Sequence, residues 1–561
     1  MSAAGLLPRF DAIARSNLAG GVYLGSSAWA DRQIGFTPTE LVREVLGGYP
    51  GSQWWYAGAA ATALALMAPI VARRWPPLIF FTLVALGSLV LALAQMTPLH
   101  TALNVALPFF ERLHEHSRER ILLLYSPAVA LLAGACVTYL PKRGTSPLLL
   151  PAAAAIPLVV AAFFGVAPDF AGLLSPDSFA FLIATSTLTV LYALLPMSLP
   201  RAGVLLALVV LVLWDPGGRI LLRGFVDESR LAVSLRGSLT RDAGTFLHDN
   251  GAANYLVGAT QSSPGRYAGY DPTHLDDPQT IDIIPPDVGY RNALADPRVN
   301  SLLVVDWATW FGLEDVQGYS PTQIQRYVEY IDALNGHRQE YHERDIFPGG
   351  ITSPLLDLLN LRYLIVPGDA PERSDFDSLL ATMPTIYEDE YVRILENLDA
   401  FPRAWLVHEA RQVTPGEALS LLADGAVDAR RTALLETAPP PLETPAGPDA
   451  ENVTFGQLEP DRIALRVAAQ APALLMMSEI WDPGWSATVD GAQAPVLIAD
   501  HVLRAVPVPA GEHQVVLSYT PPLLRLGMAI SLATMVLLAG AAIWLGARGN
   551  YRAKPDSGEE R

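Results

Sequence analysis

Long apolar runs alternate with short polar segments over the first 220 residues, and one more run lies near the C terminus. A helix that crosses a hydrocarbon core of about 30 Å needs roughly 20 residues, because each residue adds about 1.5 Å. The run at 202–214 is short and crosses only if its helix continues towards residues 219–222; otherwise it inserts halfway. The pattern predicts about seven transmembrane helices, at 54–71, 78–95, 121–140, 148–165, 179–198, 202–214 and 526–546.

Between the sixth and seventh runs the chain has the pattern of a mixed α/β domain. Apolar segments bounded by turn residues predict buried strands at 301–312 and 358–367. Apolar positions spaced three to four residues apart predict helices at 321–336 and 414–425, and Thr414 is the expected cap of the second.

A Pro-rich segment at 437–454 predicts a linker, and beyond it apolar and polar residues alternate between Asp-Gly, Pro-Ala-Gly and Asp-Pro-Gly turns. This spacing predicts a β-sandwich, in which WDPGWSATVDG (481–491) is a strand–turn–strand corner. The predicted fold is therefore a membrane α-helical bundle of about seven transmembrane helices plus an extracytoplasmic α/β domain and a C-terminal β-sandwich. Its parts are an N-terminal segment (1–53), a six-helix membrane domain (54–221) with a loop at 96–120, the α/β domain (222–436), the linker (437–454), the sandwich (455–521), a final helix (522–547) and a tail (548–561).

Composition agrees with a membrane protein, because 51% of the residues are hydrophobic and only 17% are charged. The formal net charge is −18, and most of the acidic residues lie in 222–521. Such an acidic block is typical of a soluble domain and excludes nucleic acid as the expected partner. Cys136 is the sole cysteine and lies inside an apolar run, so it is expected to be a packing residue, and no intrachain disulfide can form.

Basic residues between the runs predict the orientation of the chain, because Lys and Arg concentrate on the cytoplasmic side. The loops holding Arg73, Lys142 and Arg201 and the tail holding Arg548 are therefore expected to be cytoplasmic. The N-terminal segment and the large domain are then extracytoplasmic, and the protein is a multi-pass protein of the cytoplasmic membrane, with the lipid bilayer as a partner.

Four segments in this order resemble the C-terminal half of the YfhO-like family of bacterial membrane proteins, which is assigned to the type C glycosyltransferase superfamily (GT-C). They are FGLEDVQGYSP…QRYVEY (311–330), LLDLLNLRYLIVP (355–367), FPRAWLVHEARQV (401–413) and WDPGWSATVDG…VPVPAGEHQVVLSYTPPLLRLGMAIS (481–531). The resemblance implies a membrane glycosyltransferase that transfers a sugar from a polyprenyl-phosphate donor to a cell-surface glycan or polymer acceptor at the outer face of the membrane. It names no further cofactor.

The family's catalytic carboxylate belongs to a loop between its first two helices, and residues 1–53 contain no apolar run that could form the first helix. The resemblance therefore implies that the chain corresponds to the C-terminal portion of the family without the first helices. The alternative is a chain whose native N terminus lies on the extracytoplasmic side. The catalytic residues stay unassigned, and the transferase activity is expected only if the missing part is present.

The loop at 96–120 is the richest in functional groups and breaks the orientation rule by carrying arginines on the outer side. Guanidinium groups hold phosphate through paired hydrogen bonds. Family members carry arginines at this helix entrance, so the resemblance assigns the donor phosphate to Arg118 and Arg120, with Arg112 nearby. Possible accessory polar residues are His116, Glu111 and Glu115; the alternative is a solvated interfacial helix.

Trp481 and Trp485 are expected to pack at the corner of the sandwich, and the alternative is a sugar-stacking platform. Asp215 is expected to be a turn residue, and no metal site is predicted. The second candidate function is a non-catalytic scaffold that presents a glycan- or protein-binding module, while a transporter is disfavoured because the membrane runs hold almost no charge.

Overall fold

The computed structural model describes residues 3–17, 35–47, 56–106, 120–141, 149–166, 172–195, 199–226, 250–262, 264–270, 300–304, 307–320, 322–338, 343–368, 374–445, 447 and 451–551. The chain divides into two compact units. One is helical and covers 31–240, and the other is β-rich and covers 1–30 together with 241–561.

The helical unit holds the first six predicted membrane runs, and each coincides with a helix. Its elements are α3 (Pro38–Val42), the π-helix η1 (Arg43–Gly47), α4 (Ala59–Val71), α5 (Leu78–Ala92), the 3-10 helix η2 (Ala94–Met96), α6 (Pro98–Ala106), the 3-10 helix η3 (Arg120–Leu123), α8 (Tyr125–Tyr139), α9 (Leu149–Val166), α10 (Pro176–Leu194) and α11 (Leu199–Val226).

Helix α4 is the centre of this unit and contacts α8, α9, α10 and α11. It is rich in alanine, and almost every side chain along it is buried. Small side chains let neighbouring backbones approach closely, which is how helices pack where the hydrophobic effect is weak. Cys136 on α8 is also buried in this core, so its expected packing position is confirmed.

Length and apolarity identify three candidate membrane spans among the described residues: Ile121–Tyr139, Pro176–Leu194 and Leu524–Leu545. Three further apolar helices are shorter, at Ala59–Val71, Leu78–Ala92 and Leu149–Gly165. The helical conformation of all seven predicted runs is therefore confirmed, and three of them are long enough to cross by this measure. Helix α11 continues beyond Asp215 to Val226, as a crossing by the short sixth run requires.

The prediction that Asp215 lies in a turn is wrong. Asp215 is fully buried within α11. Its carboxylate accepts hydrogen bonds from Ala60 N at 2.9 Å and from the Tyr56 hydroxyl at 2.9 Å. The cap residue of α4 is Gly58, which has no side chain to accept from the first-turn N–H groups. Asp215 therefore caps α4 from a neighbouring helix.

The β-rich unit begins with a four-stranded sheet in the order β1-β4-β6-β5. Its strands are β1 (Arg266–Gly269), β4 (Leu361–Pro367), β5 (Thr385–Glu388) and β6 (Val392–Glu396), and the helices of this region are α14 (Gly251–Ser262), α17 (Ala308–Phe311), α18 (Gln325–Asn335), α19 (Pro354–Leu358) and α20 (Ser374–Thr382). A two-stranded sheet pairs β2 (Gly318–Tyr319) with β3 (Glu343–Arg344). The predicted strand at 358–367 and helix at 321–336 are confirmed with tighter bounds.

The predicted strand at 301–312 is wrong. Leu303 adopts a left-handed backbone with φ of 55°, and the described residues that follow include α17. An L residue rarely adopts this conformation inside a strand, so the apolar segment turns there. Its side chains Leu302, Leu303 and Trp307 are nevertheless buried, in a core shared with β4 and β6.

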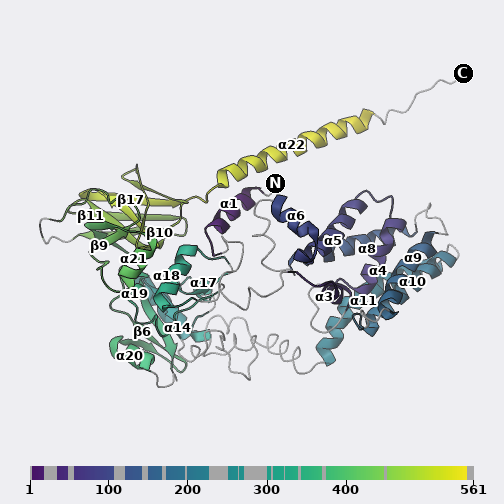
Figure 1. Cartoon of the computed structure of the whole chain (residues 1–561), viewed down its shortest axis with the longest axis horizontal. Coiled ribbons are helices and arrows are strands. Elements are labelled where there is room, and N and C mark those ends of the chain that lie inside the picture. Colours follow the sequence, from purple (N-terminus) through teal and green to yellow (C-terminus); the bar gives the residue numbers. More distant parts are fainter. Residues whose placement is uncertain are drawn as a thin grey trace. The chain divides into compact units, whose positions relative to one another are not determined.

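Two further sheets share one hydrophobic core in the region of the predicted sandwich, and the second also contains strands from before the linker. One has the order β10-β11-β17-β13-β14 and the other β7-β12-β16-β15-β9-β8. Their strands are β7 (Ala404–Val407), β8 (Glu409–Gln412), β9 (Thr432–Leu435), β10 (Asn452–Glu459), β11 (Arg462–Ala469), β12 (Ala473–Ile480), β13 (Trp485–Val489), β14 (Ala492–Ala494), β15 (Leu497–Ala499), β16 (Leu503–Val508) and β17 (Gly511–Tyr519). Figure 1 shows β10, β11 and β17 gathered at one end of this unit and β6 and α20 at the other.

Strand β12 explains the apolar run that precedes the two tryptophans. Its side chains alternate between two cores: Leu475 and Met477 pack between the two sheets, and Leu474 and Met476 pack against the helical side. A strand buried on both faces reads as a continuous apolar run. The corner prediction is also confirmed, because 481–484 turn between β12 and β13.

Strands from both sides of the Pro-rich segment lie in one sheet, since β7, β8 and β9 precede it and β12, β15 and β16 follow it. Helix α21 (Pro415–Ala423) lies between β8 and β9 and starts with the capping box predicted at Thr414, whose N–H donates to Glu417 at 3.4 Å. The division of the chain into the domains given above stays a prediction.

The last helix, α22 (Leu524–Tyr551), follows β17 and exposes many leucines. The N-terminal helix α1 (Ala3–Ala14) packs against its first turns, where Ala4 N donates to Ser531 Oγ at 3.0 Å. Residues 15–17 then pair with 323–325 through backbone hydrogen bonds. Residues 3–17 are therefore built into the β-rich unit, whereas 35–47 belong to the helical unit.

Candidate functional site

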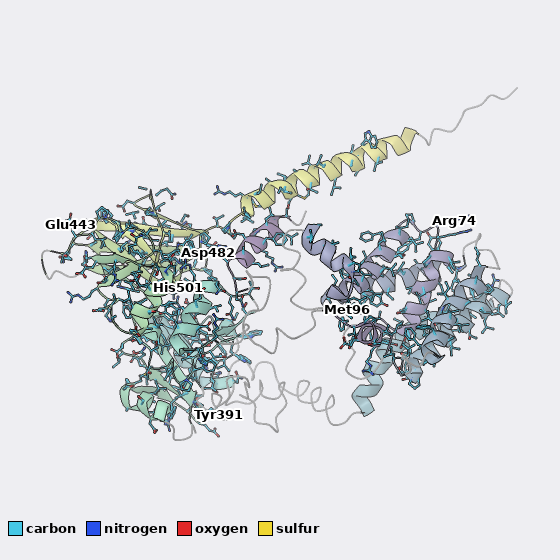
Figure 2. All side chains as sticks on the ribbon, in the orientation of Figure 1. Arg74, Met96, Tyr391, Glu443, Asp482 and His501 are labelled. Atoms are coloured by element: carbon cyan, nitrogen blue, oxygen red, sulfur yellow. The ribbon has the colours of Figure 1, made fainter. Side chains whose placement is uncertain are left out.

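An open groove of about 410 Å³ lies on the β-rich unit. It is lined by charged and aromatic side chains from β1, β12, β13, β16 and β17 and from the chain around the start of α18. These side chains are Arg266, Asp315, Tyr327, Glu479, Asp482, Trp485, Arg504 and Tyr519. Figure 2 labels Asp482 on this unit. Aromatic rings and converging polar groups are typical of small-molecule sites.

A β-bulge gives the groove its polar floor. Where β12 pairs with β16, Met477 lies opposite Arg504 and Ile480 opposite Leu503, so Ser478 and Glu479 have no partner positions. Bulges disrupt the ladder and redirect side chains, and they are enriched beside functional sites. Here the bulge places Glu479 on the groove wall at the end of an otherwise buried strand.

Two arginines and two glutamates form a closed network beneath the groove. Glu479 Oε1 accepts from Arg266 Nη2 at 2.9 Å and from Arg403 Nε at 2.8 Å. Glu314 accepts from the same two arginines, at 3.1 Å and 2.7 Å. Burial favours the neutral form of Arg403, but Glu479 and Glu314 outweigh it and raise the pKa of Arg403. Arg403 therefore stays a cation at neutral pH.

Arg504 is almost completely buried, with 4% of its surface exposed, and is fixed by three neighbours. Its Nε donates to Ile480 O at 2.9 Å, and its Nη2 lies 3.5 Å from Glu479 Oε2. Its guanidinium carbon lies 3.9 Å from the centre of the Trp485 ring, a cation–π contact. Burial lowers the pKa of Arg504 to about 10, partly offset by Glu479, so it is still a cation at neutral pH.

The turn between β12 and β13 supplies another wall. Asp482 accepts from Gly484 N at 2.8 Å, and its second oxygen lies 3.2 Å from Arg15 Nη1. The ring of Tyr519 lies 5.3 Å from that of Trp485. Burial and the neighbouring Asp482, which shares a hydrogen bond with it, raise the pKa of the Tyr519 hydroxyl. Tyr519 is therefore a neutral aromatic side chain at the groove.

The structure separates the site residues predicted from sequence. Trp485 lines the groove and also packs against the core between the two sheets, whereas the indole N–H of Trp481 donates to Val496 O at 3.2 Å. The predicted donor-phosphate and accessory residues lie outside the described residues or, for Arg120 at the start of η3, have no described side chain: Arg112, Arg118 and Arg120, with His116, Glu111 and Glu115. Within the described ranges, no group of three His, Cys, Asp or Glu residues is placed to hold a metal ion.

Sequence reasoning missed Glu479, Arg504, Arg266 and Asp482. The sequence holds one signal for Glu479. It comes directly after the apolar run ALLMM and Ser478, so a carboxylate is expected at the end of a buried strand. No local pattern marks Arg266, which reaches the groove from β1 because the fold brings that strand close to the sandwich.

These features define a multi-helix membrane protein with a large β-rich unit. The family described as bacterial membrane protein YfhO matches residues 451–531, which cover the sandwich strands β10 to β17 and the start of α22. The resemblance named from the sequence is thereby confirmed over this region. No curated protein and no solved structure matches the chain.

Proposed function

We propose that the β-rich unit binds a saccharide in the groove at Trp485 and presents it at the membrane. The observation that carries this proposal is the combination of three aromatic side chains (Trp485, Tyr519 and Tyr327) with carboxylates and guanidinium groups around one open groove. A sugar ring has an apolar C–H face that packs on aromatic rings. Its rim of hydroxyls pairs with carboxylate oxygens and guanidinium N–H groups, which are strong acceptors and donors.

Replacing Trp485 with Ala should weaken saccharide binding roughly ten-fold or more, because a loss of ~1.4 kcal/mol is a factor of ten in affinity. Binding is measured by calorimetry on the full chain in lipid nanodiscs, against a panel of oligosaccharides. Trp485→Phe should keep part of the affinity because it keeps a ring. The matched control is Trp310→Ala, which removes an indole that is 69% exposed and does not line the groove. Equal losses for both tryptophans, or no binding by the wild type, would refute the proposal.

We further propose that the β-rich unit lies outside the cell. The basic loops between the membrane runs favour this orientation. The packing of α1 on α22 supports a common side for residues 3–17 and the large unit, since both belong to one compact unit.

A cysteine placed at the exposed Ala426 should therefore react with a membrane-impermeant thiol reagent in intact cells, and one at Thr145 should not. The native Cys136 is buried and gives little background. Protection of Ala426→Cys together with labelling of Thr145→Cys would reverse the assignment.

The second candidate function is transfer of a sugar from a polyprenyl phosphate to a cell-surface acceptor. The family match over residues 451–531 favours it, since the resemblance implies membership of GT-C. Arg112, Arg118 and Arg120 are proposed to bind the donor phosphate, and the groove would then bind the acceptor glycan. Non-catalytic binding needs only the groove, so it is the function that the described geometry supports best.

A further inference from the structure

Helix α1 packs closely against the start of α22 (Figure 1). Ala4 N donates a hydrogen bond to Ser531 Oγ at 3.0 Å. Gly527 is buried one turn earlier on the same face of α22, where a Cβ would lie 2.4 Å from the carbonyl oxygen of Ala3. Backbones that approach this closely leave no room for a side chain. The first turn of α1 is therefore fixed beside the first two turns of α22.

The sequence around α22 determines how deep this contact lies in a membrane. Leu524–Leu545 is a candidate span of 22 residues, about 33 Å long at 1.5 Å per residue. Because the hydrocarbon core is about 30 Å thick, this span has little room to shift. Arg525 at its start is exposed, and the next charged residue of the chain is Arg548. Arg525 therefore lies at the level of the lipid headgroups, and Ser531 lies deeper, beside acyl chains.

The other end of α1 lies next to the groove. Arg15 Nη1 is 3.2 Å from Asp482 Oδ2 on the groove wall, and Arg15 Nη2 is 2.7 Å from Asp11 Oδ2 within the helix. The turn that holds Asp482 is bonded to the chain just before α22, since Thr520 N donates to Gly484 O at 2.9 Å. Helix α1 therefore runs antiparallel to α22, from the buried contact with this helix back towards the residues that precede the span.

Charged and apolar side chains change over at a similar level on the two helices. Arg9 is about 7.5 Å above Ala4 along α1, and Arg525 is about 9 Å above Ser531 along α22. Both arginines are exposed. Leu6 is only about 3 Å above Ala4 and is 41% exposed. The exposed side chains of α22 that follow Arg525 are likewise apolar and include Leu526, Met528 and Ile530. Leu6 thus lies below the headgroups, in the apolar layer.

We propose that the first half of α1 inserts into the bilayer beside α22, with Leu6 against acyl chains and Arg9 and Arg525 on lipid phosphates. Burying an exposed leucine among acyl chains removes its apolar surface from water. Guanidinium groups bind phosphate through charge-assisted hydrogen bonds. Since Arg15 pairs with Asp482, α1 also connects the groove wall to the membrane surface. This insertion does not depend on what the groove binds.

The depth of α1 is measured with a nitroxide label at Leu6→Cys or, as the matched control, at Ala12→Cys, in the full chain in lipid nanodiscs. Ala12 is exposed on the same face, about 9 Å nearer the groove. The ratio of collisions with oxygen, which concentrates in acyl chains, to collisions with a water-soluble nickel chelate should be several-fold higher at position 6. The native Cys136 is buried, and the chain without an added cysteine gives its background. Equal ratios at the two positions would show that α1 lies in water and overturn the proposal.

A second variant removes the contact with α22. Gly527→Leu places a side chain where the Ala3 carbonyl lies, so the label at position 6 should lose its protection from the chelate. Gly540→Leu is the control on the same helix, because nothing lies within 4 Å of a Cβ there, and it should leave the collision ratio unchanged. If the label keeps its depth in Gly527→Leu, packing on α22 does not hold α1 in the membrane, and the proposed insertion beside α22 is wrong.

Lipid binding by the two arginines is tested by native mass spectrometry of the full chain purified with phosphatidylglycerol. The double variant Arg9→Gln and Arg525→Gln should retain fewer lipid molecules than the wild type. The control Arg411→Gln changes an arginine that is 54% exposed and pairs with Glu417 in the first turn of α21, and it should retain as many. Equal retention by all three proteins would show that Arg9 and Arg525 do not bind lipid phosphate.

Discussion

Replacing Asp500 with Asn should raise the unfolding temperature of the β-rich unit at pH 8 and leave it nearly unchanged at pH 4. Asp500 lies in the turn between β15 and β16 and is fully buried. Its Oδ1 accepts from Leu434 N at 2.9 Å, and its Oδ2 has no hydrogen-bond partner among the described residues. Burial raises its pKa from 3.8 to about 7, and the Leu434 bond offsets this only in part.

The direction of this change in unfolding temperature follows from proton linkage. Between pH 4 and pH 7 the folded chain keeps a proton on Asp500 that the unfolded chain has released, so stability falls as the pH rises. Each pKa unit corresponds to about 1.4 kcal/mol, so the loss reaches about 4 kcal/mol above pH 7. Asn carries no titratable proton and avoids this loss. It also tolerates the left-handed backbone of Asp500, whose φ is 49°.

Thermal unfolding of the full chain in detergent, followed by tryptophan fluorescence between pH 4 and 8, measures this effect. A gain of about 5–15 °C is expected for Asp500→Asn at pH 8, given the usual sensitivity of domains of this size. The control Asp424→Asn changes an exposed carboxylate at the end of α21 and should leave the pH profile as in the wild type. A wild-type unfolding temperature that is flat from pH 4 to 8, with Asp500→Asn lower throughout, would mean that the carboxylate is stabilised by a partner.

The sequence predicted the elements whose signal is local. The apolar runs are too long for anything but helices in a chain of this composition, and β12 is apolar throughout because it lies between two cores. The strand predicted at 301–312 was wrong although its apolar residues are buried, because the left-handed backbone at Leu303 interrupts an extended conformation. The prediction for Asp215 failed because its neighbours Pro216 and Gly217 are typical turn residues. In the structure Asp215 lies within α11, where its carboxylate accepts from an N–H group at the start of α4.

The groove could be predicted only in part, because its residues are brought together by long-range pairing. Trp485 stood out as one of two tryptophans around a turn, yet nothing in the sequence tells it from Trp481. The difference lies in the partners: Trp481 donates to a carbonyl of the sandwich, and Trp485 stacks under Arg504 at the groove. The bulge that carries Glu479 is likewise a property of the β12–β16 register, which single-residue patterns do not encode.

If the second candidate function holds, the double replacement of Arg118 and Arg120 by Ala should abolish most of the binding of a polyprenyl-phosphate sugar. Hydrogen bonds to a charged group contribute about 1.5–3 kcal/mol each, so the loss of two guanidinium contacts should weaken binding by roughly 100-fold or more. The measurement is retention of a radiolabelled donor by the full chain in nanodiscs. Glu111→Gln is the control within the same loop and should change donor binding little.

Transfer is expected to be slow even where the donor binds, because the acceptor hydroxyl needs a general base and no residue of the chain is assigned to that role. The hydroxyl of the acceptor keeps its proton without such a group, whatever holds the leaving phosphate. Incubating the purified chain with donor and a glycan acceptor should therefore give donor binding with little product. Robust transfer that disappears on replacing Glu111 or Glu115 would instead assign the base to the loop at 96–120. Donor binding that is unchanged by the double arginine replacement would contradict the transferase function. Saccharide binding in the groove is tested separately, by the affinity of Trp485→Ala.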